Sequence, residues 1–145
     1  MLKDKIIDEI LPRVEKPARY IGNELNSVHK NYVDGMIRFV FAFPDIYEIG
    51  MSHLGIKILY HLLNDREDVS CERVFAPWVD MEEILKNESL PLFSLESMTP
   101  VKDFDFVGFT LQYEMSYTNI LNMLSLAGIP LDAADRDESH PLVIA

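Results

Sequence analysis

The sequence predicts an α/β fold in which helices cover both faces of a mainly parallel β-sheet. Short runs that are almost entirely apolar alternate along the chain with amphipathic segments, which is the pattern of strand–helix–strand units. The apolar runs lack the regular polar positions of half-exposed strands, as expected for strands that are buried on both faces. The 145 residues suit one domain of this kind.

Four segments are predicted as strands and four as helices. The first strand is the clearest, because residues 36–43 read MIRFVFAF and Pro44 ends the run. The other predicted strands are residues 69–75, 104–111 and 141–145. The predicted helices are residues 2–11, 52–63, 80–87 and 116–127, with Ser52 as the N-cap of the second and Gly128 at the C′ position of the last.

The helix over residues 52–63 carries a stripe of apolar side chains at helical spacing, and we expect this stripe to face the core. Its members are Leu54, Ile58, Leu59, Leu62 and Leu63. Right-handed crossovers between parallel strands bring all the strand carboxyl ends to one edge of the sheet. That edge is where open α/β sheets bind ligands, so the loops after the strands hold the candidate site residues.

Two parts of the chain are distinguished by their patterns. Residues 1–35 form an amino-terminal helix and an extended lead-in segment, and residues 36–145 form a Rossmann-like domain with three αβα layers. The last residues, PLVIA, read as a central strand with no loop or helix after it. We therefore expect the domain to be incomplete at its carboxyl end and to belong to a longer protein; a small protein that ends in a strand is the alternative.

Charge and cysteine content exclude several classes of function. The chain has 24 acidic and 13 basic residues and a net charge of −11, which argues against direct contact with nucleic acid or with an anionic membrane. No apolar run is long enough to span a bilayer. The single cysteine, Cys71, excludes an intrachain disulfide and an iron–sulfur cluster held by this chain alone. It also fits a cytoplasmic location.

The loop after the first strand offers a helix start with glycines and a histidine, in the sequence GMSHLG from Gly50 to Gly55. Such a loop can bind an anion, but it matches neither the dinucleotide fingerprint nor the P-loop, so nucleotide hydrolysis is not expected. His53 is either an axial metal ligand, an acid–base group or a histidine that caps the helix. No nucleophile elbow and no pair of histidines at ligand spacing occurs, so no catalytic residue and no protein metal site is predicted.

Long stretches of the chain resemble the amino-terminal region of B12-binding-type radical SAM proteins, a group of Fe–S oxidoreductases. The stretches are PARYIGNELNS, FAFPDIYEIGMSHLGIKILYHLLN, RVFAPWVDMEEIL, LPLFSLES, FDFVGFTLQYEMSYTNILNML and AGIPL. The resemblance runs from about Pro17 to Ala145. It implies a cobalamin-binding or flavodoxin-like variety of the Rossmann-like fold. It also implies that a four-iron four-sulfur cluster and S-adenosylmethionine bind only in a downstream barrel domain.

The resemblance implies that this domain binds cobalamin at the strand-end loops. The residues that it assigns to cofactor contacts are Ser52, His53, Gly55, Thr110 and Gln112. Cobalamin domains with a histidine ligand use D-x-H-x-x-G after the first strand, whereas here Met51 takes the place of the aspartate. His53 and Gly55 are also one residue closer than in that pattern. A cobalamin bound without a protein histidine is the alternative mode.

The leading hypothesis is an amino-terminal domain, not catalytic by itself, that positions a corrinoid or a substrate for the radical SAM barrel of the same protein. A second hypothesis is a degenerate Rossmann module that binds no cofactor and serves docking, and an exposed apolar surface would also allow a homo-oligomer. A stand-alone mononucleotide-binding protein is the third.

Overall fold

The computed structural model describes residues 1–145 and confirms the predicted fold class. Four strands form one sheet in which every neighbouring pair is parallel, in the order β2-β1-β3-β4. The strands are β1 (Ile37–Phe43), β2 (Val69–Phe75), β3 (Phe106–Phe109) and β4 (Leu142–Ile144). All four lie within the predicted segments, and β3 is shorter than predicted at both ends.

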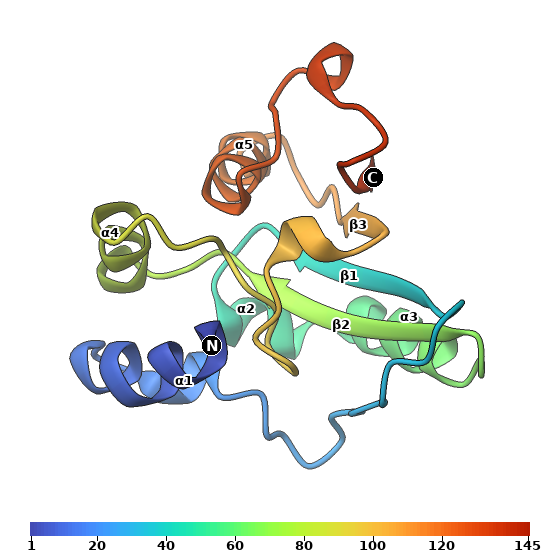
Figure 1. Cartoon of the computed structure of the whole chain (residues 1–145), viewed down its shortest axis with the longest axis horizontal. Helices are drawn as coiled ribbons and strands as arrows, with labels where there is room; N and C mark the ends of the chain where they lie inside the picture. The colour runs from blue at the N-terminus through green and yellow to red at the C-terminus, as the bar shows by residue number, and fades with distance from the viewer.

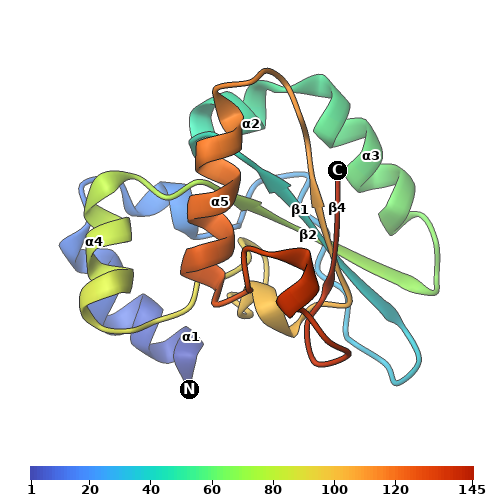
Figure 2. The ribbon, with the colours of Figure 1, turned by 90° about the horizontal axis from the view of Figure 1, so that it is seen from above.

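Helices lie on both faces of the sheet and give the Rossmann-like three-layer arrangement (Figure 2). The helix α3 (Leu54–Asn64) covers one face, whereas α4 (Val79–Asn87) and α5 (Ser116–Ala127) cover the other. The short helix α2 (Tyr47–Ser52) lies just after β1, near the strand ends. The first helix, α1 (Leu2–Lys5), continues through irregular helical turns to Arg13 beside α4 (Figure 1).

Two separate apolar cores hold these layers together. The larger core lies between the sheet and α4 and α5, and the amino-terminal turns contribute Ile6 and Ile10 to it. The smaller core lies under α3, where Ile56 and Tyr60 pack on the phenylalanine side chains of β1 and β2. Alternation along each strand sends neighbouring side chains to opposite cores, which explains why the strands are apolar throughout.

The two edges of the sheet differ. The outer edge of β2 is covered, because the amide of Leu95 donates a hydrogen bond to the carbonyl of Arg73 at 2.7 Å. Asn64 also bonds both backbone groups of Cys71, at 3.0 Å to the amide and 2.9 Å to the carbonyl. At the other edge, β4 has no strand on its outer side.

The structure corrects the predicted orientation of the helix after β1. Of the predicted inward stripe, Leu63 is half-buried, but Leu54, Ile58, Leu59 and Leu62 are 69%, 58%, 43% and 61% exposed. The buried positions are Ile56, Tyr60 and Asn64. The polar ends of Tyr60 and Asn64 have fixed partners beneath the helix, and these partners determine which side of α3 faces the sheet.

The start of α3 differs from the prediction, whereas the bounds of α5 agree with it. Ser52 is the last residue of α2 and does not cap α3, because the side chain of His53 takes the N-cap position. Helix α5 has the predicted bounds, and Gly128 follows it with φ of 72°, the left-handed conformation that glycine adopts at no steric cost. None of the helices is long and apolar enough to cross a membrane.

Candidate functional site

The candidate site lies where the strand order reverses. From β1 the chain passes to β2 on one side, and from β2 it crosses back to β3 on the other side of β1. The connections that leave β1 and β3 therefore run to opposite faces, and a crevice opens between their carboxyl ends. Figure 2 shows α2 and the start of α5 close together at this edge.

A pocket of about 200 Å³ occupies this crevice. Its walls come from the loop after β1, from the start of α3 and from the loop that leads into α5. The lining residues are Phe43, Pro44, Asp45, Ile49, His53, Gln112, Tyr113 and Ser116. Two of the predicted site residues, His53 and Gln112, thus lie at one pocket although they are far apart in the sequence. Ser52, Gly55 and Thr110 do not line it.

His53 is the best defined of the predicted residues. Its ring packs against Phe43 with centroids 5.4 Å apart, and its Nδ1 accepts a hydrogen bond from the amide of Ile56 at 3.4 Å. Because Nδ1 uses its lone pair for the cap, a neutral ring carries its hydrogen on Nε2. In that tautomer Nε2 is a donor and has no lone pair free for a metal ion.

Gly55 and Ser52 serve the local backbone. A Cβ atom at Gly55 would lie 3.0 Å from Cε1 of His53, so a glycine at this position lets the imidazole pack closely over the first turn of α3. The hydroxyl of Ser52 donates a hydrogen bond to the carbonyl of Ile49 at 2.7 Å. Both residues therefore help to shape the loop that carries His53.

Thr110 is the one residue whose buried side-chain polar atom has no hydrogen-bond partner. It directly follows β3, one position beyond the pairing of Ala42 with Phe109. Leaving a buried hydroxyl unpaired costs about 1–3 kcal/mol. Thr110 thus leaves one buried polar atom unsatisfied at the carboxyl end of β3.

Three polar residues at this edge were visible in the sequence as strand-end residues but were not singled out. Asp45 accepts a hydrogen bond from the amide of Ile46 at 2.7 Å. Ser116 donates to the carbonyl of Tyr113 at 2.6 Å. Asn119 donates to the carbonyl of Pro44 at 2.9 Å and so ties α5 to the loop after β1. Asp45 follows β1 closely, whereas Ser116 and Asn119 lie in the first turn of α5, the helix that follows β3.

The rim of the pocket is apolar and exposed. Met115 is 78% exposed, and the other large apolar side chains around it are about half exposed. These are Ile49, Leu111, Tyr113 and Tyr117. A rim of this composition suits contact with a large, flat apolar surface rather than with water.

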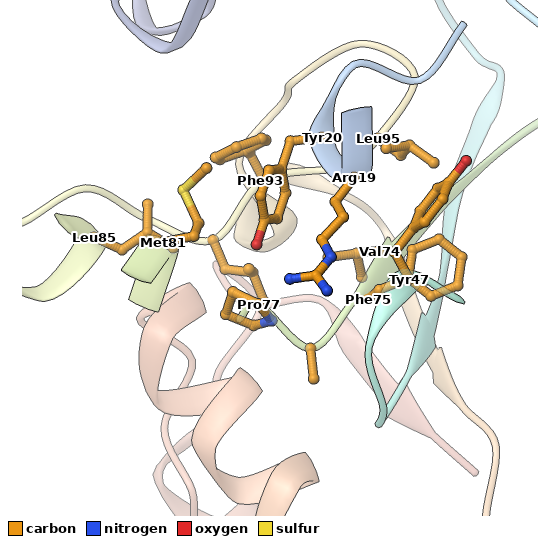
Figure 3. Close-up of a pocket in the computed structure, with 12 residues that line it drawn as sticks. Arg19, Tyr20, Tyr47, Val74, Phe75, Pro77, Met81, Leu85, Phe93 and Leu95 are labelled. Atoms are coloured by element: carbon orange, nitrogen blue, oxygen red, sulfur yellow. The ribbon is translucent and has the colours of Figure 1, made fainter. Parts of the chain in front are cut away.

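A second cavity, next to Arg19, is too small for a ligand (Figure 3). Its volume is about 20 Å³, enough for a single water molecule. The guanidinium of Arg19 lies between the side chains of Pro77 and Tyr47, donates from Nε to Glu48 at 2.9 Å, and lies 5.1 Å from the ring of Trp78. This cluster ties the lead-in segment to the loop after β2.

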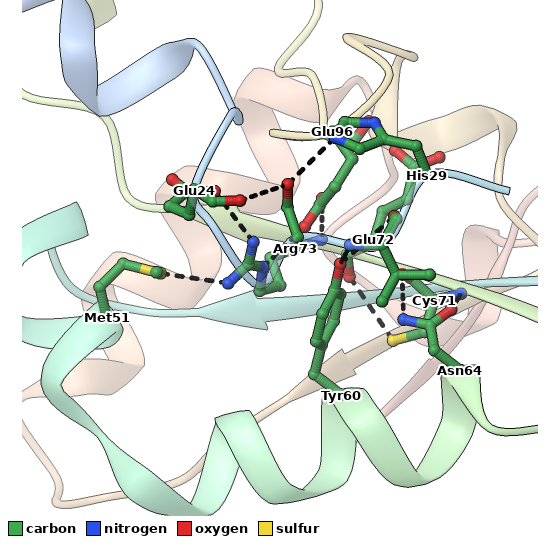
Figure 4. A network of polar contacts seen from close by, with 12 residues as sticks. Glu24, His29, Met51, Tyr60, Asn64, Cys71, Glu72, Arg73 and Glu96 are labelled. Atoms are coloured by element: carbon green, nitrogen blue, oxygen red, sulfur yellow. Dashed lines mark hydrogen bonds and ion pairs between the residues drawn. The ribbon is translucent and has the colours of Figure 1, made fainter.

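A buried ionic network lies under α3 (Figure 4). Arg73 donates from Nε to Glu96 at 2.6 Å and from Nη2 to Glu24 at 3.1 Å, and its guanidinium lies 4.3 Å from the ring of Tyr60. Burial opposes the charge of Arg73, but Glu96 beside it raises the pKa of the guanidinium. Nearby, burial raises the pKa of the Cys71 thiol, which is therefore unreactive. The network is structural.

The fold and this edge define a Rossmann-like α/β domain with a crevice at the carboxyl ends of its strands. Residues 55–145 match the family model described as radical SAM proteins, N-terminal. The match covers more than half of the chain, and the chain belongs to this family. Comparisons with curated proteins and with solved structures found no match. Within the chain, no group of three or more His, Cys, Asp or Glu side chains is placed to hold a metal ion.

Proposed function

We propose that this chain is the positioning domain of a radical SAM protein and that it binds a corrinoid across the carboxyl edge of its sheet. The unpaired hydroxyl of Thr110 carries the proposal: it lies outside the pocket wall, two residues before Gln112, and a ligand whose polar group reached it would remove the cost of burying it. The apolar rim and the side chain of Gln112 beside the pocket support it. The chain itself supplies binding and orientation, and the corrinoid, when bound, supplies the capacity for group transfer at its metal.

The proposed mode is a corrinoid held without a histidine ligand. The pocket of about 200 Å³ is smaller than usual ligand pockets of about 300–1,000 Å³. A corrinoid would therefore lie over the edge, with only part of it in the crevice. Ligation by His53 would break the cap on Ile56, and Met51 offers no carboxylate to orient the ring. His53 thus shapes the pocket as a helix cap.

The test is a titration of the purified chain with hydroxocobalamin, followed by its absorbance and by calorimetry. We expect saturable binding at micromolar concentrations, and we expect His53→Ala to bind with an affinity within about threefold of the wild type. Loss of binding and of its spectral change in His53→Ala, with the fold kept by circular dichroism, would establish histidine ligation and contradict the proposed mode. No heat and no spectral change for the wild type at high micromolar cobalamin would contradict corrinoid binding.

A second candidate function is a docking module that binds no cofactor. The small volume of the pocket and the exposed apolar rim favour it. The two functions differ in what covers the rim. In the corrinoid-binding function a small molecule covers it, and in the docking function another part of the radical SAM protein does. If cobalamin does not bind while the rim becomes protected from solvent in the whole protein, the docking function is the correct one.

A further inference from the structure

The exposed apolar side chains of α3 form one flank of the helix. Ile56, Tyr60 and Asn64 are the buried positions that face the sheet, and Leu63 beside them is half-buried. With 100° between successive residues, Leu59 and Leu62 fall on one side of this inward line, and Lys57 and His61 fall on the other. A helix with three sides of different character, one buried, one polar and one apolar, has an additional apolar surface that its own domain does not use.

The contacts of Asn64 show which way each flank points. Asn64 bonds the amide and the carbonyl of Cys71, and those backbone groups point away from β1, to the outer edge of β2. Asn64 lies on the Lys57 side of the inward line, so the polar flank overlooks that outer edge. The apolar flank, with Leu59, therefore overlooks β3 and β4.

The sheet under that flank is apolar and uncovered. Phe39, Phe106 and Leu142 lie side by side across β1, β3 and β4, and the rings of Phe39 and Phe106 stack with centroids 6.1 Å apart. On β4, Leu142 is 63% exposed and Ile144 is 47% exposed. The smaller core ends at β1 and β2, because it contains no residue of β3 or β4. On this face α2 and α3 pack on the smaller core with β1 and β2 (Figure 1).

We propose that this surface, called here the α3 groove, binds an amphipathic helix from the rest of a radical SAM protein. The groove has α3 as its wall and the β3–β4 half of the sheet as its floor. Its residues are Leu59, Phe106, Leu142 and Ile144. A parallel sheet is stable with helices on both faces, so a helix is the element that fits the space beside α3. The occupant belongs to a radical SAM protein because this family forms the amino-terminal region of such proteins.

Charge argues against a second copy of the chain as the occupant. The net charge of −11 makes two copies repel each other. The occupant is therefore a helix with an apolar face from another part of the protein.

The test compares thiol labelling in the isolated chain and in a radical SAM protein that carries this chain as its amino-terminal region. Leu59→Cys and Leu142→Cys put a thiol on the wall and on the floor of the groove, and His61→Cys is the control on the polar flank. Cys71 is 1% exposed, so it contributes little background. Labelling by a maleimide is read by mass spectrometry on the peptides that contain each position.

We expect all three variants to react quickly in the isolated chain. In the whole protein, Leu59→Cys and Leu142→Cys should react at least tenfold more slowly, and His61→Cys should be unchanged. Equal rates in both proteins, or protection of only one side of the groove, would overturn the proposal. Protection that rises with the concentration of the isolated chain would assign the groove to a second copy and also overturn it. The result does not depend on corrinoid binding, because no residue of the crevice takes part.

Discussion

Glu96 is a carboxylate held almost entirely out of water in the network under α3. Both of its oxygens face Arg73, one accepting from Nε at 2.6 Å and the other from the backbone amide at 2.8 Å. Burial raises the pKa of Glu96 from 4.5 to about 7, against the opposing effect of the Arg73 charge. In the unfolded chain the same carboxyl is fully exposed and keeps its ordinary pKa.

This difference predicts how stability changes with pH. Between pH 4.5 and 7 the folded chain binds more protons than the unfolded chain at this site, so the free energy of unfolding falls as the pH rises. Glu96 makes its full contribution to the free energy of unfolding below pH 4.5, and this contribution is lost as the pH rises through 7. Its size is on the order of 1–3 kcal/mol. Urea unfolding at pH 5 and pH 8 measures it. Glu96→Gln should have a flatter dependence than the wild type, and an equal slope in the two proteins would contradict the assignment.

Single residues show why the site was only partly predictable from the sequence. His53 and Gln112 were expected at the strand-end edge, and the structure brings both to one pocket. The cap that His53 makes to Ile56 depends on where α2 ends, which propensity alone does not fix. The unpaired hydroxyl of Thr110 is a property of packing between β1 and β3, and a sequence does not show which polar atoms lack partners.

At the scale of elements, α3 shows that an apolar stripe at helical spacing need not be the side of a helix that is buried. The sequence correctly predicts a helix with an apolar stripe, but the stripe is not what the domain buries. Tyr60 and Asn64 are anchored instead, Tyr60 by accepting a hydrogen bond from the amide of Val28 at 2.7 Å. Because that partner lies in the lead-in segment, remote in sequence, local pattern did not reveal it. Strand positions were easier to predict, since a strand buried on both faces is apolar at nearly every position.

Two substitutions in α3 test which of its sides stabilises the isolated chain. Tyr60→Phe leaves the amide of Val28 without its acceptor, so we expect the free energy of unfolding to fall by about 1–2 kcal/mol. Leu62→Ala removes only exposed surface and should change it by less than about 0.5 kcal/mol. Chemical denaturation of both variants measures these effects. A cost above about 2 kcal/mol for Leu62→Ala would mean that the apolar flank is already buried in the isolated chain.

At the scale of the whole molecule, the strand order places the crevice between β1 and β3 and leaves the α3 groove on one face. The parallel order was predictable, since alternating strands and helices favour right-handed crossovers. The open half of the α3 face was not, because an apolar strand such as β4 has the same sequence whether or not a helix covers it. The crevice and the α3 groove are separate surfaces, and the proposed ligand and the proposed helix would each occupy one of them.

The central claim is that a corrinoid binds at the carboxyl edge of the sheet and supplies the hydrogen-bond partner that the hydroxyl of Thr110 lacks. The most direct measurement is the free energy of unfolding of the wild type and of Thr110→Val, with and without hydroxocobalamin. Without ligand, the variant should be more stable by about 1 kcal/mol, because a methyl group replaces an unpaired buried hydroxyl. With ligand, the wild type should gain stability, and the variant should gain at least about 1 kcal/mol less. Equal gains in the two proteins, or no gain in either, would contradict the claim.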